Sequence, residues 1–514
     1  MSGVADSLAT ATSVELGRRV AHRAETRLFI DGALTEATGG ATYRNLSPAT
    51  GLVLGDAAAA SAPDMERAIG AARRAFDETS WSTDRGLRRH CLEQLQTAIE
   101  SEKEDLRAEL VAEVGCPVMA TSDAQLDWPL TDSLRYPASL IDTFEWERTL
   151  DGGGLFGPRN VRTVVKEAAG VVAAITPSNY PIEVILNKIG PALAAGNTVI
   201  LKPDPNTPWN AARLGRLVAE KTDIPPGVFN VVTTPDNDVA GLLVDDPRVD
   251  LISFTGSTAV GRILMQRAAA TMKRTFLELG GKSALIVTDG ADLSKAVMAT
   301  IGACSHAGQA CAVNTRILVH KSLFDDLAAG AAEAYQQIPV GDPVDPGTFV
   351  GPLISAAQKQ KVLGMLDQAR ADGARFLTGG GEVDGLAEHL RGGHFVAPTL
   401  VTGVDNSAAI AQDEVFGPVA ILIPFADDDE AVRLANDSRF GLAGAVMSDT
   451  AERGMALARR VRTGAVGVNG GMFYGADAPF GGYKNSGIGR QCGIEGFDQY
   501  LETKTVAGRL PRGS

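Results

Sequence analysis

From residue 170 onward, short apolar runs alternate with longer segments of helical length, and this alternation constrains the fold more than any other feature of the sequence. The short runs are continuously apolar, which is typical of strands buried on both faces of a parallel sheet. They span residues 170–176, 197–201, 228–232 and 249–254. The helical segments between them include residues 181–195 and 208–221, and another follows Thr258. Strands that alternate with helices predict βαβ units and an α/β fold.

A second set of the same kind follows Gly281 and predicts a second α/β domain. Its expected strands are residues 284–287, 316–320, 419–423 and 465–468, and its expected helices are residues 292–306, 323–337, 359–371 and 429–436. A chain of 514 residues is too long for one hydrophobic core, which agrees with two or more domains. Upstream, we expect a hairpin turn at Asp31-Gly32 and helical segments over residues 64–76 and 87–114.

The charge and the apolar pattern exclude two kinds of partner. The formal net charge is −14 and no basic block occurs, so we expect no nucleic-acid partner. No apolar stretch reaches the roughly eighteen residues that a membrane-spanning helix needs, so we expect no membrane partner. Residues 1–27 hold no apolar core of a signal peptide, and the expected location is cytoplasmic.

The cysteines and histidines do not predict a metal or a disulfide framework. Five cysteines are scattered along the chain and odd in number, which favours free thiols in a reducing compartment. No cysteine pair has close metal-ligand spacing, and the six histidines form no HExxH motif. We therefore expect no metal.

Cys311 and Glu278 are the candidate pair for covalent chemistry. Cys311 ends the run GQAC at residues 308–311, and Glu278 lies in LELGGK at residues 277–282. A thiolate attacks a carbonyl carbon, and a carboxylate then activates water. Each residue alone also fits a structural role, the cysteine as a small buried hydrophobe and the glutamate at the end of a helix or strand.

A nucleotide site is predicted where the run FTGSTAVG, residues 254–261, follows a strand and begins a helix. A helix N-terminus after a glycine turn is a ready anion site. Gly256 would let the backbone approach a phosphate, and Ser257 would donate to it. The run is not GxGxxG, and an ordinary capped turn would have the same pattern.

Two more polar residues follow strands of the same set. Lys202 ends a strand, where it would reach a ribose or a phosphate, although a solvated lysine fits this position too. Asn179 lies just past the strand that ends at Thr176, at the edge where open α/β sheets bind ligands. Its amide would stabilise an oxyanion, unless it only precedes a helix as a turn residue.

Seven motifs, taken in their order, resemble the aldehyde dehydrogenase superfamily. They are TPSNYP at residues 176–181, LKP at 201–203, FTGS at 254–257, LELGGK at 277–282, GQAC at 308–311, EVFGP at 414–418, and PFGG at 479–482 with Lys484, Ser486-Gly487 and Gly489-Arg490. The match extends over nearly the whole chain from about residue 27. The order and spacing of the motifs together are far more specific than any one of them.

The resemblance implies a subunit of three parts. They are a Rossmann-like cofactor domain over residues 1–147 and 169–279, an α/β catalytic domain over 280–494, and a β oligomerisation arm over 148–168 and 495–514. Residues 162–166 and 503–507 are the expected arm strands, and Gly152-Gly153-Gly154 is expected where the arm's hairpin begins. The family usually forms dimers and tetramers, so the resemblance implies a homodimer or homotetramer.

The resemblance also implies a mechanism. Cys311 attacks the aldehyde carbon, and the Asn179 amide and the Cys311 backbone N–H hold the oxyanion of the thiohemiacetal. Hydride transfer to the nicotinamide leaves a thioester, which water activated by Glu278 hydrolyses to a carboxylic acid. The catalytic residues implied are therefore Cys311, Glu278 and Asn179.

By the same resemblance, NAD contacts residues from several separate segments. The implied cofactor-binding residues are Thr176, Pro177, Ser178, Lys202, Gly256, Ser257, Gly261, Leu279, Glu414 and Phe416. Ser257 would contact the pyrophosphate, and Lys202 the adenosine-side ribose. Glu414 would bind the nicotinamide ribose, with Phe416 packed near that ring.

Three positions depart from the family pattern. Ser178 stands where the family commonly has Trp, next to Asn179. Pro205 stands where many NAD-preferring members have the Glu that binds the adenine-ribose hydroxyls, so a 2′-phosphate would meet less repulsion. No Arg or Lys nearby would bind that phosphate, and Asp204 is acidic. NAD is therefore expected first, with NADP open. Gln491 replaces the usual Glu after Gly-Arg, with no chemical consequence expected.

Other functions within the family stay open. In a CoA-acylating aldehyde dehydrogenase, CoA rather than water takes the acyl group, and members of that type usually lack the Glu at position 278. Inorganic phosphate is the acceptor in a phosphorylating variant. A catalytically silent member that serves as a structural or binding protein would be expected to lose Cys311, Glu278 or Asn179, and this sequence keeps all three.

We expect the substrate to be a small-molecule aldehyde in an apolar tunnel. The expected walls are residues 127–136, 180–183, Ala310, Ala312 and 469–474. Trp128, Tyr180 and Phe473 are aromatic, which favours medium-chain aliphatic or aromatic aldehydes over semialdehydes. Arg135 is the one arginine of these segments that would bind a substrate carboxylate, and it is expected at the surface instead.

Overall fold

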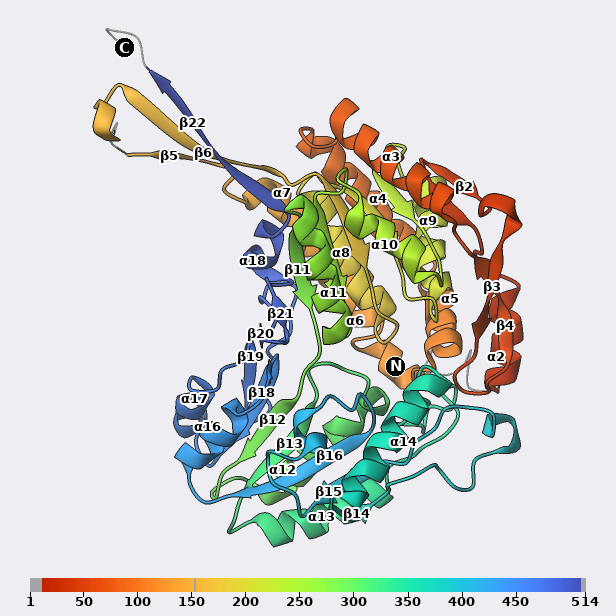
Figure 1. The fold of residues 1–514 in the computed structure, drawn as a ribbon, viewed down its shortest axis with the longest axis vertical. Coiled ribbons are helices and arrows are strands. Elements are labelled where there is room, and N and C mark those ends of the chain that lie inside the picture. Colours follow the sequence, from red (N-terminus) through yellow and green to blue (C-terminus); the bar gives the residue numbers. More distant parts are fainter. Residues whose placement is uncertain (1–11, 152–153, 510–514) are drawn as a thin grey trace.

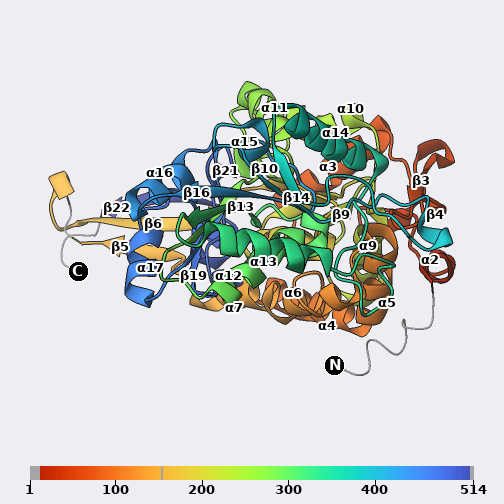
Figure 2. The same ribbon diagram turned by 90° about the horizontal axis from the view of Figure 1, so that it is seen from below.

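The computed structural model describes residues 12–151 and 154–509. Two α/β units lie side by side, and a narrow arm of strands projects from them (Figure 1). Seen from below, the arm again extends well clear of both units (Figure 2). The α/β fold class predicted from the alternating runs is confirmed.

The first sheet has eight strands in the order β2-β1-β9-β8-β7-β10-β11-β21. They are β1 (Leu28–Ile30), β2 (Ala33–Thr35), β7 (Val171–Ile175), β8 (Thr198–Lys202), β9 (Phe229–Val231), β10 (Leu251–Thr255), β11 (Arg274–Glu278) and β21 (Gly487–Ile488). The central strands β9, β8, β7, β10 and β11 run parallel to one another. At the edges, β1 pairs antiparallel with β9, β2 with β1, and β21 with β11. The predicted strands and the hairpin turn at Asp31-Gly32 are confirmed.

Helices cover both faces of this sheet, because alternate residues of each strand point to opposite faces. Val172 and Val199 pack into a core with α8, while Ala173 and Ile200 pack into another with α3. The helices of this unit are α2 (Ser13–Ala21), α3 (Ala62–Glu78), α4 (Arg85–Ser101), α5 (Lys103–Glu109), α6 (Asp127–Asp132), α7 (Arg135–Thr143), α8 (Pro181–Ala194), α9 (Pro208–Lys221), α10 (Asn237–Asp245), α11 (Thr258–Ala268) and α18 (Gly493–Asp498). Every residue of α8 is buried, which matters for the site.

The second sheet has seven strands in the order β14-β15-β16-β13-β12-β18-β19. They are β12 (Ser283–Val287), β13 (Asn314–His320), β14 (Arg375–Thr378), β15 (Thr399–Thr402), β16 (Val419–Phe425), β18 (Ala443–Met447) and β19 (Ala465–Val468). All neighbours are parallel except β14 and β15. Its helices are α12 (Leu293–Ile301), α13 (Phe324–Gln336), α14 (Ala356–Ala371), α15 (Ala409–Gln412), α16 (Asp428–Asn436) and α17 (Ala451–Ala458).

The arm consists of β5 (Glu147–Leu150), β6 (Asn160–Ala168) and β22 (Leu501–Arg509). β22 pairs with β6 antiparallel over its full length, with Thr503 opposite Lys166 and Ala507 opposite Arg162. Both predicted arm strands are therefore confirmed. The predicted position of the glycine run at the start of the hairpin is wrong: the hairpin begins at Glu147, and Gly154 lies in the connection between β5 and β6. Gly152 and Gly153 lie outside the described residues.

Two of the predicted helices are not continuous α-helices over their predicted length. The segment 87–114 is interrupted at Glu102, whose backbone leaves the helical region and whose carboxylate bonds to Arg213 and Arg216. The segment 292–306 leaves the α-helix at Ile301, and His306 and Ala307 adopt positive φ angles of 49° and 54°. The pattern also missed the short antiparallel pair β3 (Thr42–Leu46) and β4 (Val53–Ala58) and the pair β17 (Phe440–Gly441) and β20 (Tyr483–Lys484).

Across residues 12–151 and 154–509, none of the helices has both the length and the apolar character that crossing a bilayer requires.

Candidate functional site

The predicted site residues follow the carboxyl ends of neighbouring parallel strands. β7 ends beside β8 with Ile175 opposite Lys202, and β10 ends beside β11 with Thr255 opposite Glu278. The residues that follow each strand therefore share one edge of the first sheet, which is where open α/β sheets bind ligands. The Thr176 N–H donates to the Lys202 carbonyl at 3.1 Å, which holds the Asn179 loop against the end of β8.

Two glycines bring Cys311 to this edge from the second unit. A Cβ atom on Gly281 would lie 2.1 Å from the Cys311 carbonyl oxygen, and one on Gly308 would lie 2.0 Å from the Gly417 carbonyl oxygen. Neither position has room for a side chain. The Cys311 turn can therefore lie directly against the strand-end loop that follows Glu278 and against the loop that carries Glu414.

The side chain of Asn179 is fixed beside the cysteine turn. Its Nδ2 donates to the Gln309 backbone carbonyl at 2.7 Å, and the Asn179 backbone carbonyl accepts from Gln125 Nε2 at 2.8 Å. An amide nitrogen carries two N–H donors, and Gln309 uses one. The second N–H contacts no acceptor among the described residues, so it is free for an oxygen of a ligand on Cys311.

Glu278 is a buried carboxylate without a partner. Its side chain is only 4% exposed, and neither Oε1 nor Oε2 accepts a hydrogen bond from any residue that the structure describes. Burial raises the pKa of this carboxyl well above its usual range, while the positive charges of Lys188 and Arg490 partly oppose the rise. A Cβ atom on Gly481 would lie 2.7 Å from Oε1, so the glycine leaves room beside the carboxyl. Buried polar groups are rarely left unpaired, which suggests that a ligand or water completes this one.

The thiol of Cys311 shares that environment. Burial raises its pKa, and the carboxylates of Glu278 and Glu414 raise the pKa further. At rest the sulfur is therefore protonated, and an acceptor must take its proton before it can attack a carbonyl. The other cysteine nearby in sequence, Cys304, is fully buried in the core of the second unit, as expected of a packing residue.

The predicted cofactor residues lie on three further segments of the same edge. Ser257 is the N-cap of α11, where its Oγ accepts from the Val260 N–H at 3.3 Å. A Cβ atom on Gly261 would lie 2.5 Å from Leu279 Cδ2, so this glycine lets the helix pack closely on Leu279. The Gly256 N–H donates to the Glu278 carbonyl at 3.0 Å. The nucleotide loop and the carboxylate are thus held together by backbone contacts.

Lys202 and Thr176 are both buried at the strand ends. Lys202 is 8% exposed, and burial lowers the pKa of its ammonium while Asp204 opposes the shift. The Thr176 hydroxyl is buried and has no partner among the described residues. Pro177 and Ser178 follow Thr176 in the same loop and are half-buried. Like Glu278, the threonine presents an unpaired polar atom at this edge.

Glu414 and Phe416 reach the site from the loop between α15 and β16. Glu414 Oε1 accepts from the Gly281 N–H at 2.9 Å, so its carboxylate lies against the glycine turn after Glu278. Phe416 has a positive φ of 56°, and its carbonyl accepts from Gln358 Nε2 at 2.8 Å. The structure thus brings all the predicted site residues to one region, although they come from six separate stretches of the chain.

One buried acidic residue was missed by sequence reasoning. Glu183 lies in the first turn of α8, and its Oε1 accepts from Asn187 Nδ2 at 2.5 Å and from the Tyr474 hydroxyl. Burial raises the pKa of Glu183 to about 7. The sequence indicates Glu183 only as the last residue of the expected pocket wall over residues 180–183. A lone carboxylate in a helix that is apolar except for Asn187 and Lys188 was the signal that could have identified it.

Two further predictions concern a metal site and the position of Arg135. The described residues contain no cluster of three or more His, Cys, Asp or Glu side chains that could hold a metal ion. Arg135 bonds to Glu100 at 2.7 Å and its side chain is 51% exposed, so its predicted place at the surface is confirmed.

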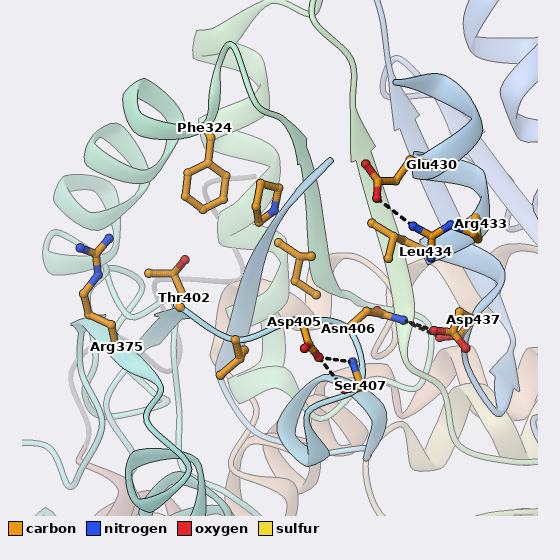
Figure 3. Close-up of a pocket in the computed structure, with 14 residues that line it drawn as sticks. Phe324, Arg375, Thr402, Asp405, Asn406, Ser407, Glu430, Arg433, Leu434 and Asp437 are labelled. Carbon is orange, nitrogen blue, oxygen red and sulfur yellow. Dashed lines mark hydrogen bonds and ion pairs between the residues drawn. The ribbon is translucent and has the colours of Figure 1, made fainter. Parts of the chain in front are cut away.

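A large open hollow lies outside this site, in the second unit (Figure 3). It has a volume of about 670 Å³ and lies between α13, β16 and α16. None of the predicted site residues lines it. Its acidic groups all have partners: Glu430 bonds to Arg433 at 2.8 Å, Asp405 to the Ser407 N–H at 2.8 Å, and Asp437 to Asn406 Nδ2 at 3.0 Å.

Comparison with known proteins gives one consistent family. The sequence profile of the aldehyde dehydrogenase family matches residues 34–506. A 3-succinoylsemialdehyde-pyridine dehydrogenase from a Pseudomonas species is 39% identical over 488 residues, which cover 93% of this chain and 98% of that protein.

Solved structures agree in fold. A point variant of betaine aldehyde dehydrogenase from Staphylococcus aureus, with NAD⁺ and a BME-modified cysteine, superposes with a TM-score of 0.91 at 35% identity, covering 95% of this chain and 98% of that one. A cysteine-to-alanine variant of aldehyde dehydrogenase C from Pseudomonas syringae, with NAD⁺ and octanal, gives a TM-score of 0.89 at 35% identity, covering 96% and 98%.

Proposed function

The chain belongs to the aldehyde dehydrogenase family, and we propose that it oxidises an aldehyde to a carboxylic acid through a thioester on Cys311. It is an NAD-dependent aldehyde dehydrogenase. The observation that carries the proposed roles is Glu278, a buried carboxyl with no hydrogen-bond partner among the described residues, just before the glycine turn that packs against Cys311. Such a group has no structural bond to maintain and is free to act on water.

In the first step the Cys311 sulfur attacks the aldehyde carbon. The S–C bond forms as the C=O π bond breaks, and the oxygen becomes an oxyanion. The free N–H of the Asn179 amide and the Cys311 backbone N–H are the proposed donors to that oxygen. The thiol proton is released to solvent water before the attack, so Glu278 remains free to accept a proton in the last step.

NAD supplies the oxidant, because its nicotinamide accepts hydride from the carbon attached to sulfur. The edge of the first sheet fits such a cofactor, since α11 begins there and the buried Thr176 hydroxyl has no partner in the part of the chain that the structure describes. The proposed contacts are Thr176, Pro177, Ser178, Lys202, Gly256, Ser257, Gly261, Leu279, Glu414 and Phe416. They would hold the two ends of the cofactor on the same side of Cys311.

In the last step Glu278 removes a proton from water. The water oxygen bonds to the thioester carbon, the C–S bond breaks, and the carboxylic acid leaves as the Cys311 sulfur recovers its proton. Because Glu278 can activate water to hydrolyse the thioester, the acyl group needs no other acceptor. We therefore favour hydrolysis over acyl transfer to CoA or phosphate.

We propose NAD as the preferred cofactor. Asp204 Oδ1 accepts from the Asn206 N–H at 2.9 Å and lies two residues beyond Lys202, so a negative charge remains near the place of the adenine ribose. That charge disfavours the 2′-phosphate of NADP, even though Pro205 removes the glutamate common at this position. NADP remains open as a weaker cofactor.

The proposed substrate tail lies beside Trp128 and Tyr474, whose ring centroids are 5.2 Å apart. Aromatic side chains suit medium-chain aliphatic or aromatic aldehydes. The octanal in the structure of the Pseudomonas syringae relative is consistent with this class.

We further propose the three-part division of the chain and its assembly. Residues 1–147 and 169–279 would bind the cofactor, 280–494 would carry Cys311, and 148–168 with 495–514 would form the arm. Nearly all of β22 is exposed, and β19 is the outer strand of the second sheet. Exposed strands invite pairing with a second copy, so a homodimer or homotetramer is proposed. Five free cysteines, with the proposed nucleophile Cys311 among them, suit the reducing cytoplasm.

The test is the formation of NADH and NADPH, measured by absorbance, with a panel of aldehydes and neither CoA nor phosphate. NADH formation that exceeds NADPH formation supports the hydrolytic assignment and the cofactor preference. Activity that appears only with CoA or only with phosphate would replace hydrolysis by acyl transfer. Silence under all three conditions would favour a non-catalytic role.

A further inference from the structure

His306 is a buried histidine that the proposed mechanism does not use. It lies five residues before Cys311, it is only 3% exposed, and its Nε2 has no hydrogen-bond partner among the described residues. Burial lowers the pKa of the ring to about 4, and the Asn179 backbone opposes that fall only in part. The ring is therefore neutral at ordinary pH and poorly suited to act as an acid or a base.

The backbone at His306 is strained. His306 and Ala307 have positive φ angles of 49° and 54°, and neither residue is a glycine. L-residues adopt this region at a cost in free energy, and they persist there where the surrounding contacts over-determine the chain, often at functional sites. Gly308 continues the turn with a φ of 72°. The turn that leads to Cys311 is thus set by its contacts rather than by local preference.

The backbone carbonyl of His306 connects this turn to the Asn179 amide. It accepts from the Gln309 N–H at 3.0 Å and from Gln309 Nε2 at 3.4 Å. The Gln309 side chain is anchored as well, because its Oε1 accepts from the Ile354 N–H at 2.8 Å. The Gln309 backbone carbonyl, held in this way, accepts from Asn179 Nδ2 at 2.7 Å. The direction of the Asn179 amide therefore depends on the turn that begins at His306.

The ring of His306 connects to the same amide by a second route. It packs edge-on against Tyr180, with the ring centroids 5.2 Å apart and an angle of 65° between the planes. Tyr180 directly follows Asn179 in the chain, and Gln125 Nε2 holds the Asn179 backbone carbonyl at 2.8 Å. His306 thus supports Asn179 through its ring on Tyr180 and through its carbonyl on Gln309.

We propose that His306 is a positioning residue, whose ring holds Tyr180 and so keeps the Asn179 amide directed at the oxygen of an aldehyde bonded to Cys311. The inference rests on the proposed function, in which that amide donates to the oxyanion. Such a donor stabilises the transition state only if it already lies in the right place. A displacement of about 1 Å can cost on the order of 10²-fold in rate. A neutral ring gives this support without adding a charge near the thiol.

The test compares two reactions of the same thiol in His306→Ala. Oxidation of an aldehyde with NAD passes through an oxyanion, so it needs the Asn179 amide. Alkylation by iodoacetamide does not, because the S–C bond forms as the C–I bond breaks and iodide leaves. We expect the single-turnover rate of NADH formation to fall by about 10- to 100-fold. The rate of alkylation at Cys311, followed by mass spectrometry, should stay within about twofold of wild type.

A second variant ties the effect to Asn179. Asn179→Ala should itself slow NADH formation by about 10²- to 10³-fold, which is the usual loss when an oxyanion donor is removed. Adding His306→Ala should then slow the reaction by no more than about twofold further, because the amide that His306 positions is already absent. Asn179→Ala at the wild-type rate would instead remove the oxyanion donor itself, and so would be recognised as a failure of the proposed function.

Two further variants isolate the ring. His306→Phe keeps a flat ring against Tyr180 and should hold NADH formation within about threefold of wild type. His320→Ala is the matched control, because the His320 ring also packs edge-on against an aromatic ring, that of Phe425, with centroids 5.5 Å apart in the second unit. Both rates in this control should stay within about twofold of wild type.

Three results would overturn the inference. One is NADH formation at the wild-type rate in His306→Ala. Another is an equal loss of NADH formation and alkylation, because that result would mean a general distortion of the Cys311 turn. The third is a full multiplicative loss when His306→Ala is combined with Asn179→Ala. If His306→Ala does not fold, His306→Leu fills the space without a ring and decides the question by the same two rates.

Discussion

The region around Cys311 and the open hollow of the second unit differ in how their acidic groups are satisfied. In the hollow, Glu430 bonds to Arg433, Asp405 to Ser407 and Asp437 to Asn406, so each acid has a partner among the residues that line it (Figure 3). At the strand ends of the first sheet, both oxygens of Glu278 and the hydroxyl of Thr176 are buried without a partner in the described structure. The hollow is a wide, open cavity. The strand ends instead hold buried polar atoms that have no hydrogen-bond partner among the described residues.

The difference shows which structural signal points to function. A folded chain gains little by leaving a buried carboxylate unpaired, since the desolvated group costs about 1–3 kcal/mol or more. Such a group is retained where a substrate, cofactor or water completes it. An open hollow whose charged groups already have partners carries no such free-energy cost when no ligand is bound. Volume alone is therefore a poor guide to the site in this molecule.

The largest expected effect is at Cys311. Cys311→Ala removes the only proposed nucleophile, so NAD-dependent turnover should fall by at least about 10⁴-fold. Steady-state NADH formation measures this. Cys304→Ala is the matched control, because that cysteine is buried in the core and takes no proposed part in chemistry. Retained turnover in Cys311→Ala would remove the basis for the thioester.

Glu278→Gln should have the next largest effect. The amide keeps the size of the side chain but cannot accept a proton from water, so hydrolysis of the thioester should slow by about 10²- to 10⁴-fold. Stopped-flow absorbance should show a burst of NADH close to one equivalent per site, followed by a slow phase. An unchanged steady-state rate would contradict the assignment of Glu278 as the base.

The pH dependence of hydrolysis should be a smaller effect. Burial raises the pKa of Glu278, and only its ionised form accepts a proton. The rate of thioester hydrolysis should therefore rise with pH through a pKa well above that of an ordinary carboxyl, and fall as pH drops below it. Single-turnover acid release from pH 5 to 9 measures this rise. A hydrolysis rate that does not change from pH 5 upward would contradict the claim that a carboxyl with a raised pKa is the base.

The smallest effect is expected in the hollow. Glu430→Gln makes the same substitution as Glu278→Gln, but at a side chain with a partner on its own helix and an exposed fraction of 34%. Turnover should stay within about twofold of wild type, and the free energy of unfolding should change by less than about 0.5 kcal/mol. Activity assays and urea denaturation check the two values. A large loss of turnover would mean that the hollow has a part in function after all.

Local patterns in the sequence predicted the secondary structure well where one residue type dominates a segment. The predicted helix 208–221 matches α9 at both ends, and the predicted strand 465–468 matches β19. The prediction failed where distant contacts decide the backbone. Glu102 ends a helix by bonding to Arg213 and Arg216, more than a hundred residues away. His306 and Ala307 adopt positive φ angles that no apolar pattern indicates.

The candidate site was predictable in part. The motif order placed Cys311, Glu278 and Asn179 in one site, and the structure brings their segments together through Gly281 and Gln309. Glu183 was not singled out, because its meaning depends on Tyr474, a residue 291 positions away in the sequence. A sequence shows that an acid stands in an apolar helix, but only the packed structure shows which of its oxygens lacks a partner.

The most direct measurement maps the acyl group on the protein. Glu278→Gln is mixed with NAD and an aldehyde, quenched in acid, digested and analysed by mass spectrometry. Acyl mass on the peptide that contains Cys311, dependent on NAD, is the result expected if the unpaired groups at the strand ends form the active site. Acyl mass on Cys304 or Cys492 instead, or NADH formation with no acyl peptide at all, would contradict it.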